Sequence, residues 1–490
     1  MPGITPPLLA TRLVRLQVAQ ETAWGTAVPA TAQWLGIAPQ PKITPGISAT
    51  PYDEQRGSLH PSYAAPVLKH GGTFDLAGAA TYEDIMYLLA MGYGIGTNPL
   101  AASLDSLTIT GNTIANPTVV TVSAAHGLVA GQYVTIAGSN STPSINGSWP
   151  VTPVAGQPTK FTIPVNCSGT GSAGTVSCVC GFAITIISKA SNAVVTTGTI
   201  AHQLVNGDLV YISGSNSTPT IDGWHTVANA TTYTFTCGVD TSAGAVGSAG
   251  TVWRPAKSTF SSPGDTAWNP TALTMELGEH ETASGIVASG GLLQSWGLSG
   301  SGAKELAFTA KGFFAHVNVT PTALTDLTAV GAQTRVVQQI LFPEITLAMD
   351  VAGATPGTTP VAGRLTNLTL DVDTGLTPNM TSGSLDPTSF AENKTKADMK
   401  LGVLVDASTF GTFLANNPTK GLPVVTELVA TSGYKRLVID YAGVLSADPA
   451  FFEDDQGNRL YNLQMSALYD SGPIGGVMNV TLYNGLPCLL

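Results

Sequence analysis

Two glycine-rich stretches have the spacing of nucleotide-binding loops. Residues Gly169–Gly174 match Gly-x-Gly-x-x-Gly, and Gly297–Lys304 have the outline of a phosphate-binding loop. A dinucleotide site needs its glycines between a strand and a helix whose N-terminus faces the pyrophosphate, whereas Thr175–Cys178 continues as a strand. In the second stretch, Ala303 stands where the phosphate-binding lysine is required. Both stretches are therefore predicted to be turns.

Histidines and carboxylates provide no catalytic or metal-binding set. His126 and His202 each precede a leucine and a glycine turn, and we expect each ring to bond to a turn backbone. His70-Gly-Gly72 would form an esterase oxyanion loop only with a Gly-x-Ser-x-Gly elbow, which the sequence lacks. The acidic run Glu453–Asn458 lacks the alternating ligands and distal glutamate of a calcium loop, and it predicts a hairpin.

Five cysteines are too few and too irregularly spaced for a disulfide framework or a zinc site. They are Cys167, Cys178, Cys180, Cys237 and Cys488. We expect reduced thiols, consistent with assembly in a cytoplasm. The sequence thus predicts no catalytic, cofactor-binding or metal-binding residues, and no enzyme. A glycan-cleaving enzyme stays an alternative, because its paired-carboxylate cleft cannot be recognised from sequence alone.

Composition points to a folded chain that buries much of its surface against other chains. Of 490 residues, 43% are hydrophobic and only 10% are charged, against roughly 25% charged in an average soluble domain. A surface so poor in charge limits solubility unless it becomes interface. The net charge of −11 and the absence of a basic run disfavour a protein that grips DNA. We expect neither a secretory leader nor a membrane span.

An internal repeat is the clearest feature along the chain. His126–Pro143 reappears 76 residues later as His202–Pro219, and both copies close on Gly-Ser-Ala-Gly-Thr-Val. Trp149 is matched with Trp224. Short Val/Ile/Thr runs between Gly, Pro, Asn and Ser clusters are typical of small all-β modules. Residues 98–180 and 181–252 are therefore predicted to be two tandem β-domains.

These repeats interrupt a domain of different composition. Only six of the 51 charged residues lie between Asn98 and Val252. The step in composition at both ends predicts an insertion into a discontinuous domain formed by residues 1–97 and 253–490.

Residues 1–97 and 253–490 are predicted to be mainly β. Apolar and polar residues alternate as in strands with one buried face; the apolar sets are Ile345/Leu347/Met349, Leu368/Leu370/Val372, Tyr461/Leu463/Met465/Tyr469 and Met478/Val480/Leu482. Two short helices are also expected. One begins after a Thr81 cap, with Glu83 and Asp84 in its first turn, and ends at Gly92; the other runs from Ser408 towards Pro418.

The order of segments resembles the major tail tube proteins of long-tailed bacteriophages. The stretch Leu16–Thr26 resembles their opening strand followed by Glu-Thr-x-aromatic-Gly-Thr, and Asp53–Ser58 their acidic-Arg-Gly loop. Lys69–Gly94 is similar to their strand–helix–glycine step, and the closing strands fit the C-terminal half. The repeats separately resemble β-domains of phage structural proteins, with the signature His-Gly-Leu-x-x-Gly-x-x-Val-x-Ile-x-Gly.

The resemblance implies a tail-tube β-sandwich that polymerises as stacked hexameric rings around a DNA-wide channel in the virion tail. Implied partners are further copies of the chain and the tape measure, terminator and tip proteins, with DNA passing unbound. Rings would stack through the segment Ala49–Gly72, whose inter-ring residues are Tyr52, Asp53, Glu54 and Arg56. We expect a net negative channel. Asp371, Asp373, Glu344 and Asp350 lie on polar strand faces, which point either into the channel or outward.

The repeats are expected to decorate the outside of the tube, where their Ser/Thr-rich surface is suited to a host-surface glycan or to simple spacing. Replacing Asn98–Trp253 by a short linker should leave the remaining domain folded. A secreted or surface-layer adhesin of tandem β-modules stays open as the alternative.

Overall fold

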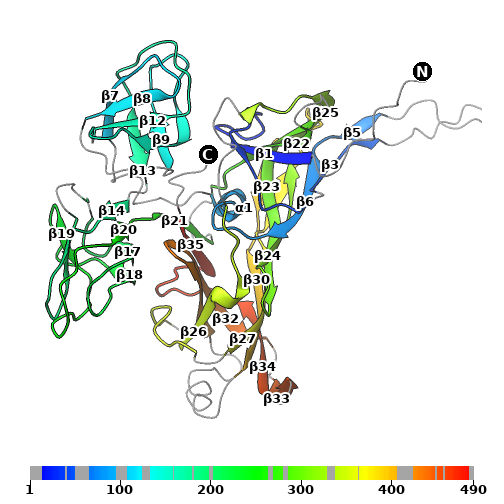
Figure 1. Cartoon of the computed structure of the whole chain (residues 1–490). Helices are drawn as coiled ribbons and strands as arrows, with labels where there is room; N and C mark the ends of the chain where they lie inside the picture. Colours follow the sequence, from blue (N-terminus) through cyan, green and yellow to red (C-terminus); the bar gives the residue numbers. More distant parts are fainter. Residues whose placement is uncertain are drawn as a thin grey trace, which may run out of the picture.

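The computed structural model is mainly β, with several antiparallel sheets, as predicted. It describes residues 14–38, 41–49, 66–94, 107–123, 133–157, 159–178, 181–197, 202, 204–262, 269–279, 285–327, 337–351, 353–361, 364–404, 423–446, 450–455 and 458–484. The strands form a two-layered body and two smaller groups beside it (Figure 1).

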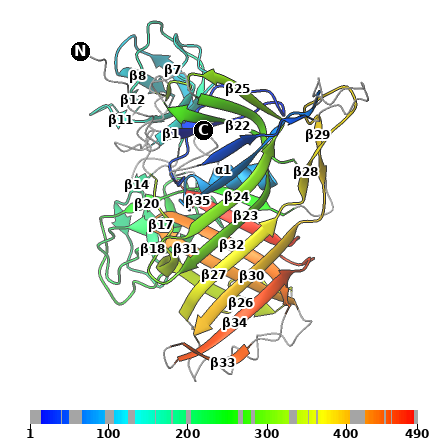
Figure 2. The ribbon, with the colours of Figure 1, turned by 90° about the vertical axis from the view of Figure 1, so that its right-hand side faces the viewer.

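One layer of the body, the front sheet, faces the viewer in Figure 2. Its strands run antiparallel in the order β3 (Lys42–Pro45), β6 (Gly72–Ala79), β24 (Ala307–Phe314), β23 (Gly285–Ser301), β27 (Arg364–Asp373), β30 (Lys396–Leu404), β34 (Asn458–Ala467) and β33 (Ala450–Asp455).

The other layer, the back sheet, packs behind it. Its order is β21 (Ala256–Ser261), β35 (Met478–Asn484), β32 (Lys435–Leu445), β31 (Pro423–Ser432) and β26 (Ile345–Val351), which follows the 3-10 turn η4 (Phe342–Glu344). The end of β32 also pairs with β34, which joins the two layers at a corner.

The long strand β23 extends beyond the front sheet into a smaller one. Its first half pairs with β22 (Leu273–Glu279) and β25 (His316–Thr322), and β22 pairs in turn with β1 (Val14–Gln20), which also pairs with β2 (Ala32–Gln33). Two hairpins project from this end of the body: β4 (Ser48–Ala49) with β5 (Val67–Lys69), and β28 (Leu376–Asn379) with β29 (Ser389–Glu392).

The predicted apolar faces lie in the core between the layers. Leu368, Leu370 and Val372 are buried, while Asp371 and Asp373 on the same strand are exposed. The sets on β34 and β35 follow the same alternation, because each strand presents one face to the core. Tyr469 is an exception: β34 ends at Ala467, and the Tyr469 ring is 52% exposed. Its predicted place on the buried face was wrong. On β26, Leu347 and Met349 are buried, but Ala348 and Asp350 are buried as well, so the predicted polar face is absent there.

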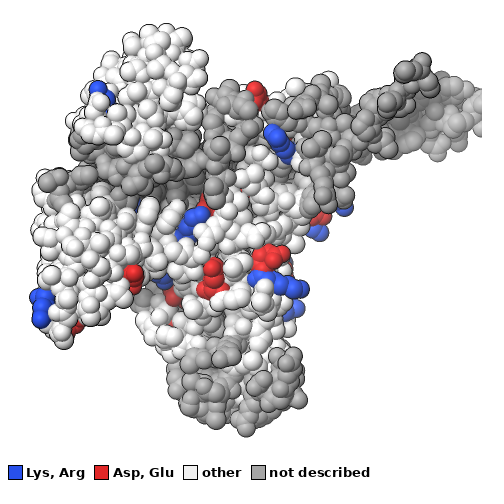
Figure 3. Space-filling view, in the orientation of Figure 1, with Lys and Arg blue, Asp and Glu red and all other residues white. Residues whose placement is uncertain are grey.

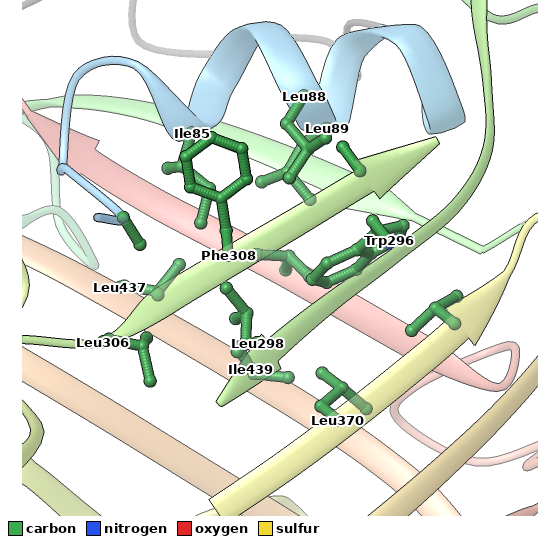
Figure 4. Packing of buried hydrophobic residues seen from close by; sticks show 14 of the residues in the cluster. Ile85, Leu88, Leu89, Trp296, Leu298, Leu306, Phe308, Leu370, Leu437 and Ile439 are labelled. Carbon is green, nitrogen blue, oxygen red and sulfur yellow. The ribbon is translucent and has the colours of Figure 1, made fainter. Parts of the chain in front are cut away.

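One α-helix is described, α1 (Ile85–Tyr93), and all nine of its residues are buried. It packs against β23 and β21, and Figure 4 shows Ile85, Leu88 and Leu89 above Phe308 and Trp296. The predicted end at Gly92 was wrong, because the helix runs on to Tyr93 and ends at Gly94, which has a φ of +72°.

The predicted start of α1 also needs correction. Thr81 does accept a hydrogen bond from the backbone N–H of Asp84 (2.9 Å), but residues 82–84 form a turn before the helix. Glu83 pairs with Lys435 and Asp84 binds the N–H groups of Leu35 and Gly36, so neither carboxylate serves the first turn. The predicted helix from Ser408 lies outside the described residues.

Strands between α1 and β21 pair only among themselves in the described part of the chain. The first group contains β7 (Leu107–Asn112), β8 (Thr118–Val122), β9 (Tyr133–Ala137), β10 (Gly147–Pro150), β11 (Thr152–Pro153), β12 (Lys160–Ile163) and β13 (Thr175–Cys178). The second contains β14 (Gly181–Ala183), β15 (Ile186–Ile187), β16 (Val194–Thr196), β17 (Leu209–Ser213), β18 (Gly223–Thr226), β19 (Thr234–Thr236) and β20 (Thr251–Trp253). We call these groups the first and second modules; the predicted boundaries of two inserted domains stay predictions.

Strands β9, β10 and β13 of the first module correspond to β17, β18 and β20 of the second at the offset of 76 residues, but the matched tryptophans do not correspond. Trp149 lies opposite Val134, and at the same register His225 lies opposite Val210. Trp149 donates its indole N–H to the carbonyl of Ile145, and His225 Nε2 bonds to the carbonyl of Ile221, both at 2.7 Å. His225 therefore replaces Trp149, and Trp224 occupies the position of Ser148.

Candidate assembly surfaces

The stretches with nucleotide-loop spacing have structural roles. Gly174 has a φ of +118°, and strand β13 follows it directly. Gly297–Ser301 belongs to strand β23, and the turn begins only at Gly302. The predicted turn is therefore wrong for Gly297–Ser301, which continue the strand, and it holds only from Gly302 onward. The acidic run at Glu453 is a hairpin in which Asp455 pairs with Asn458, also as predicted.

His202 is a buried structural histidine. Its Nδ1 accepts the backbone N–H of Leu204 at 3.0 Å, which confirms the predicted bond to the turn. Burial lowers the pKa of the ring because the charged form is desolvated. His126 lies outside the described residues. Cys167 and Cys237 are free and buried. The described residues contain no cluster of His, Cys, Asp and Glu suited to a metal ion.

The Glu-Thr-x-Trp-Gly-Thr stretch forms a hydrogen-bond network around one buried carboxylate, which we call the Glu21 network. Glu21 accepts hydrogen bonds from the backbone N–H groups of Gly25 (2.8 Å) and Gly290 (2.7 Å) and from the hydroxyl of Thr274 (2.8 Å). Trp24 donates its indole N–H to the carbonyl of Gly290 (3.1 Å). The motif therefore ties the N-terminal strand to the point where β23 changes sheets.

Burial raises the pKa of Glu21 through desolvation, and its three hydrogen bonds oppose that rise. The glycines are required: Gly25 and Gly290 both have positive φ, at +78° and +69°. The sequence pattern alone does not indicate that this motif holds a junction of the fold.

The outward face of the front sheet is a broad polar surface. Among the residues of these strands whose side chains the structure describes, the exposed charged ones are four lysines and four aspartates: Lys42, Lys311, Lys396, Lys400, Asp75, Asp371, Asp373 and Asp398. One row crosses six strands in direct register, in the order Lys42, Asp75, Lys311, Ser295, Asp373 and Lys396. Opposite charges therefore face one another across neighbouring strands, which stabilises the pairing.

Small residues in the middle of this face leave a shallow hollow. It has a volume of about 330 Å³, and Ser295, Thr309, Asp371 and Lys396 are among its lining residues. Glu344 and Asp350, also predicted to lie on polar strand faces, lie outside this surface. Asp350 is buried and accepts hydrogen bonds from Gly357 and Thr358, while Glu344 accepts one from the hydroxyl of Tyr82 (3.3 Å).

The projecting hairpins meet at a small titratable cluster. Asp386, between β28 and β29, lies 3.5 Å from His70 Nδ1 and 3.3 Å from His316 Nδ1. The backbone N–H of His70 also donates to the carbonyl of Leu385 (2.7 Å). The predicted inter-ring residues Tyr52, Asp53, Glu54 and Arg56 lie outside the described residues.

The outer face of the back sheet carries a row of half-buried charges. Asp440 lies directly opposite Glu427 on the neighbouring strand. Burial and the Glu427 carboxylate raise the pKa of Asp440 to about 7, and the cations of Arg436 and Lys257 oppose this. Burial also raises the pKa of Glu427.

The second module packs against this same face through aromatic rings. Trp224 meets Tyr483 with ring centroids 5.6 Å apart, and Trp253 stacks on Tyr434 at 5.2 Å. The guanidinium of Arg436 lies over the Trp224 ring at 5.7 Å. Elsewhere the modules are almost free of charge, as Figure 3 shows on the side that it presents.

Neither a family model nor a curated protein matches this chain. Within the described ranges, no helix combines the length and apolar character needed to cross a bilayer.

Proposed function

We propose that this chain is a tail tube subunit of a long-tailed bacteriophage. It assembles into rings, six copies in each, and the rings stack into a tube that conducts DNA. The chain acts as a structural protein, without catalysis. Its partners are other copies of itself and the proteins that terminate and fill the tail.

The observation that supports the proposal most is the outward face of the front sheet. It is wide, continuous and polar, and it carries no large apolar side chain among its described exposed residues. A surface of small hydroxyl side chains and balanced charge suits a water-filled channel. Four lysines against four aspartates provide no excess of cations to release counterions from phosphates, so DNA slides along the face without adhering.

Closure of six such sheets into one barrel would also pair the edge strands of each front sheet with those of its neighbours. A lone sheet must protect the unpaired N–H and C=O groups of its edge strands, whereas a closed barrel has no free edge. The low overall charge of 10% fits a chain whose surface becomes interface. Asp371 and Asp373 then face the channel beside Lys311 and Lys396, and the net negative charge of the channel as a whole stays a prediction.

The projecting hairpins form the contacts between rings in this proposal. Hairpin β4–β5 leads into and out of the segment that carries Tyr52, Asp53, Glu54 and Arg56. Its base is fixed within its own subunit by the bond from His70 to Leu385, so the tip can reach the neighbouring ring. The two modules lie on the opposite side of the body from the front sheet and decorate the outside of the tube.

The experiment is sedimentation velocity and negative-stain electron microscopy of the purified full chain. We expect rings or tubes with a central channel. Replacing Tyr52, Asp53, Glu54 and Arg56 together by alanine should prevent stacking and leave single rings. The control replaces the exposed module residues Asp222 and Asp240 by alanine and should still form tubes. Monomers at every concentration, for the unmodified chain, would exclude the proposal.

A further inference from the structure

The second module meets the body through a surface that the first module lacks. On the body, the platform consists of Arg436 and Tyr483, on the outer face of the back sheet, and of Tyr434 in the turn between β31 and β32. On the module, Trp224 and Trp253 meet it directly, and Tyr211 supports Trp224 with ring centroids 5.7 Å apart. Aromatic pairs at these separations stabilise beyond the area that they bury.

Strand register identifies the corresponding residues of the first module. Tyr211 lies opposite both Trp224 and Trp253 on neighbouring strands. In the first module Thr135 lies opposite both Ser148 and Ser177 in the same way. Each of the three aromatic residues is therefore replaced by a small hydroxyl residue, although the strands themselves are equivalent.

The junction between the second module and the body is also specialised. Only Arg254 and Pro255 separate β20 from β21. Arg254 is buried and pairs with Asp208 at 2.8 Å, and it also donates to the carbonyl of His202 (3.4 Å). Pro255 restricts this two-residue connection, because the proline ring fixes its own φ. At the same offset of 76 residues the first module has Cys178 and Gln132, which cannot form an ion pair.

We propose that the second module is an anchor that the platform holds in a single orientation, and that the first module is carried by it. The partner of the platform is thus a segment of this same chain. The two modules share one buried apolar cluster, separate from that of the body, so an anchored second module also positions the first. The duplicated modules have diverged into an anchor and a carried unit.

Arg436 gives the platform its specificity. It lies over the Trp224 ring, and its positive charge opposes the rise that burial causes in the pKa values of the Glu427 and Asp440 carboxyls on the same face of the sheet. A guanidinium over the face of an aromatic ring is attracted to the ring's negative face by a cation–π interaction. The platform therefore recognises an aromatic ring rather than any apolar side chain.

The test gives the second module the residues of the first, in the full chain: Tyr211→Thr, Trp224→Ser and Trp253→Ser. Small-angle X-ray scattering should show a larger maximum dimension, because the module detaches. Hydrogen exchange at the start of β32 and the end of β35 should become about tenfold faster. Exchange within β17 should stay slow, because the core of the module is untouched.

Two further variants separate detachment from misfolding. Tyr434→Ser changes only the body and should cause the same shifts to a smaller extent. Tyr233→Thr removes an exposed aromatic residue of the second module away from the platform and should change neither measurement. If the triple variant and Tyr434→Ser both leave the scattering and the exchange of the platform strands unchanged, the anchor proposal is wrong. The result does not depend on whether the chain forms tubes.

Discussion

At the scale of single residues, buried carboxylates hold the body together at the points where strands change direction. Glu21 satisfies three donors, and Glu276 similarly binds the N–H groups of Ala30 (3.0 Å) and Thr325 (2.7 Å). Both side chains link segments far apart in the sequence. Loss of such an acceptor leaves buried donors unsatisfied, which costs more than the bonds themselves contribute.

Glu21→Ala is therefore expected to lower the free energy of unfolding by about 3 kcal/mol, because three donors lose their acceptor. Chemical denaturation measures the change. Glu21→Gln keeps one acceptor oxygen and should lose less. The control Glu392→Ala removes an exposed carboxylate on β29 and should change stability by less than about 0.5 kcal/mol. Equal losses in the free energy of unfolding for Glu21→Ala and Glu392→Ala would contradict the proposed role of the Glu21 network.

Asp440 should make stability depend on pH. Its pKa in the folded chain is about 7, above the ordinary value of about 3.9, so the folded state binds the proton more tightly than the unfolded state. Stability is therefore highest below pH 4 as far as this group is concerned, and it falls as the pH rises from about 4 to 7.

Asp440→Asn should remove this fall and raise the free energy of unfolding at pH 8 by about 3 kcal/mol. Urea denaturation at a series of pH values tests it. Asp371→Asn, on the exposed face of the front sheet, is the control. An unchanged pH profile in Asp440→Asn would show that the carboxylate opposite Glu427 is not the group responsible.

At the scale of elements, the sequence was most informative where one face of a strand is buried. The alternation of Leu368, Leu370 and Val372 with exposed aspartates required only a period of two. The helix was less predictable because it is buried on every side, so no polar face marks its limits. Gly92 has the type expected of a helix end, but tertiary packing continues the helix to Gly94.

Gly94→Ala tests where the helix ends. Gly94 needs a positive φ, and an added Cβ would also overlap the carbonyl oxygen of Asn269. Gly302 has a φ of +61° and open space around it, so an alanine there has only the cost of the unfavourable backbone conformation. Gly94→Ala should therefore lower the melting temperature more than Gly302→Ala. The free energies of unfolding of the two variants should differ by about 2 kcal/mol. Equal effects of the two variants would contradict the close approach.

Other elements could not be derived from sequence for physical reasons. The repeat was plain, but matching Trp149 with Trp224 ignored the strict alternation of a strand, in which a shift of one residue turns a side chain to the opposite face. Trp224 therefore faces the body instead of its own core. Trp224 and Trp253 could have indicated this contact from the sequence, because large aromatic residues on an outward face mark contact surfaces.

At the scale of the whole molecule, the anchor changes what removal of the modules should do. Strands before Tyr93 pair with strands after Trp253, so the body does not need module strands for its sheets. However, replacing Asn98–Trp253 by a linker would expose Tyr434 and Tyr483. The core of the body is therefore expected to fold without the modules, while the exposed rings are expected to lower its solubility.

The central claim is that the outward face of the front sheet lines a channel in an assembled tube. Cryo-electron microscopy of tubes formed by the full chain tests this most directly, because it places every strand relative to the tube axis. The account predicts rings in which Asp371, Asp373 and Lys396 face the channel, while the second module lies outside against Tyr434 and Tyr483. A reconstruction with this face turned outward, or with the modules inside the ring, would contradict it.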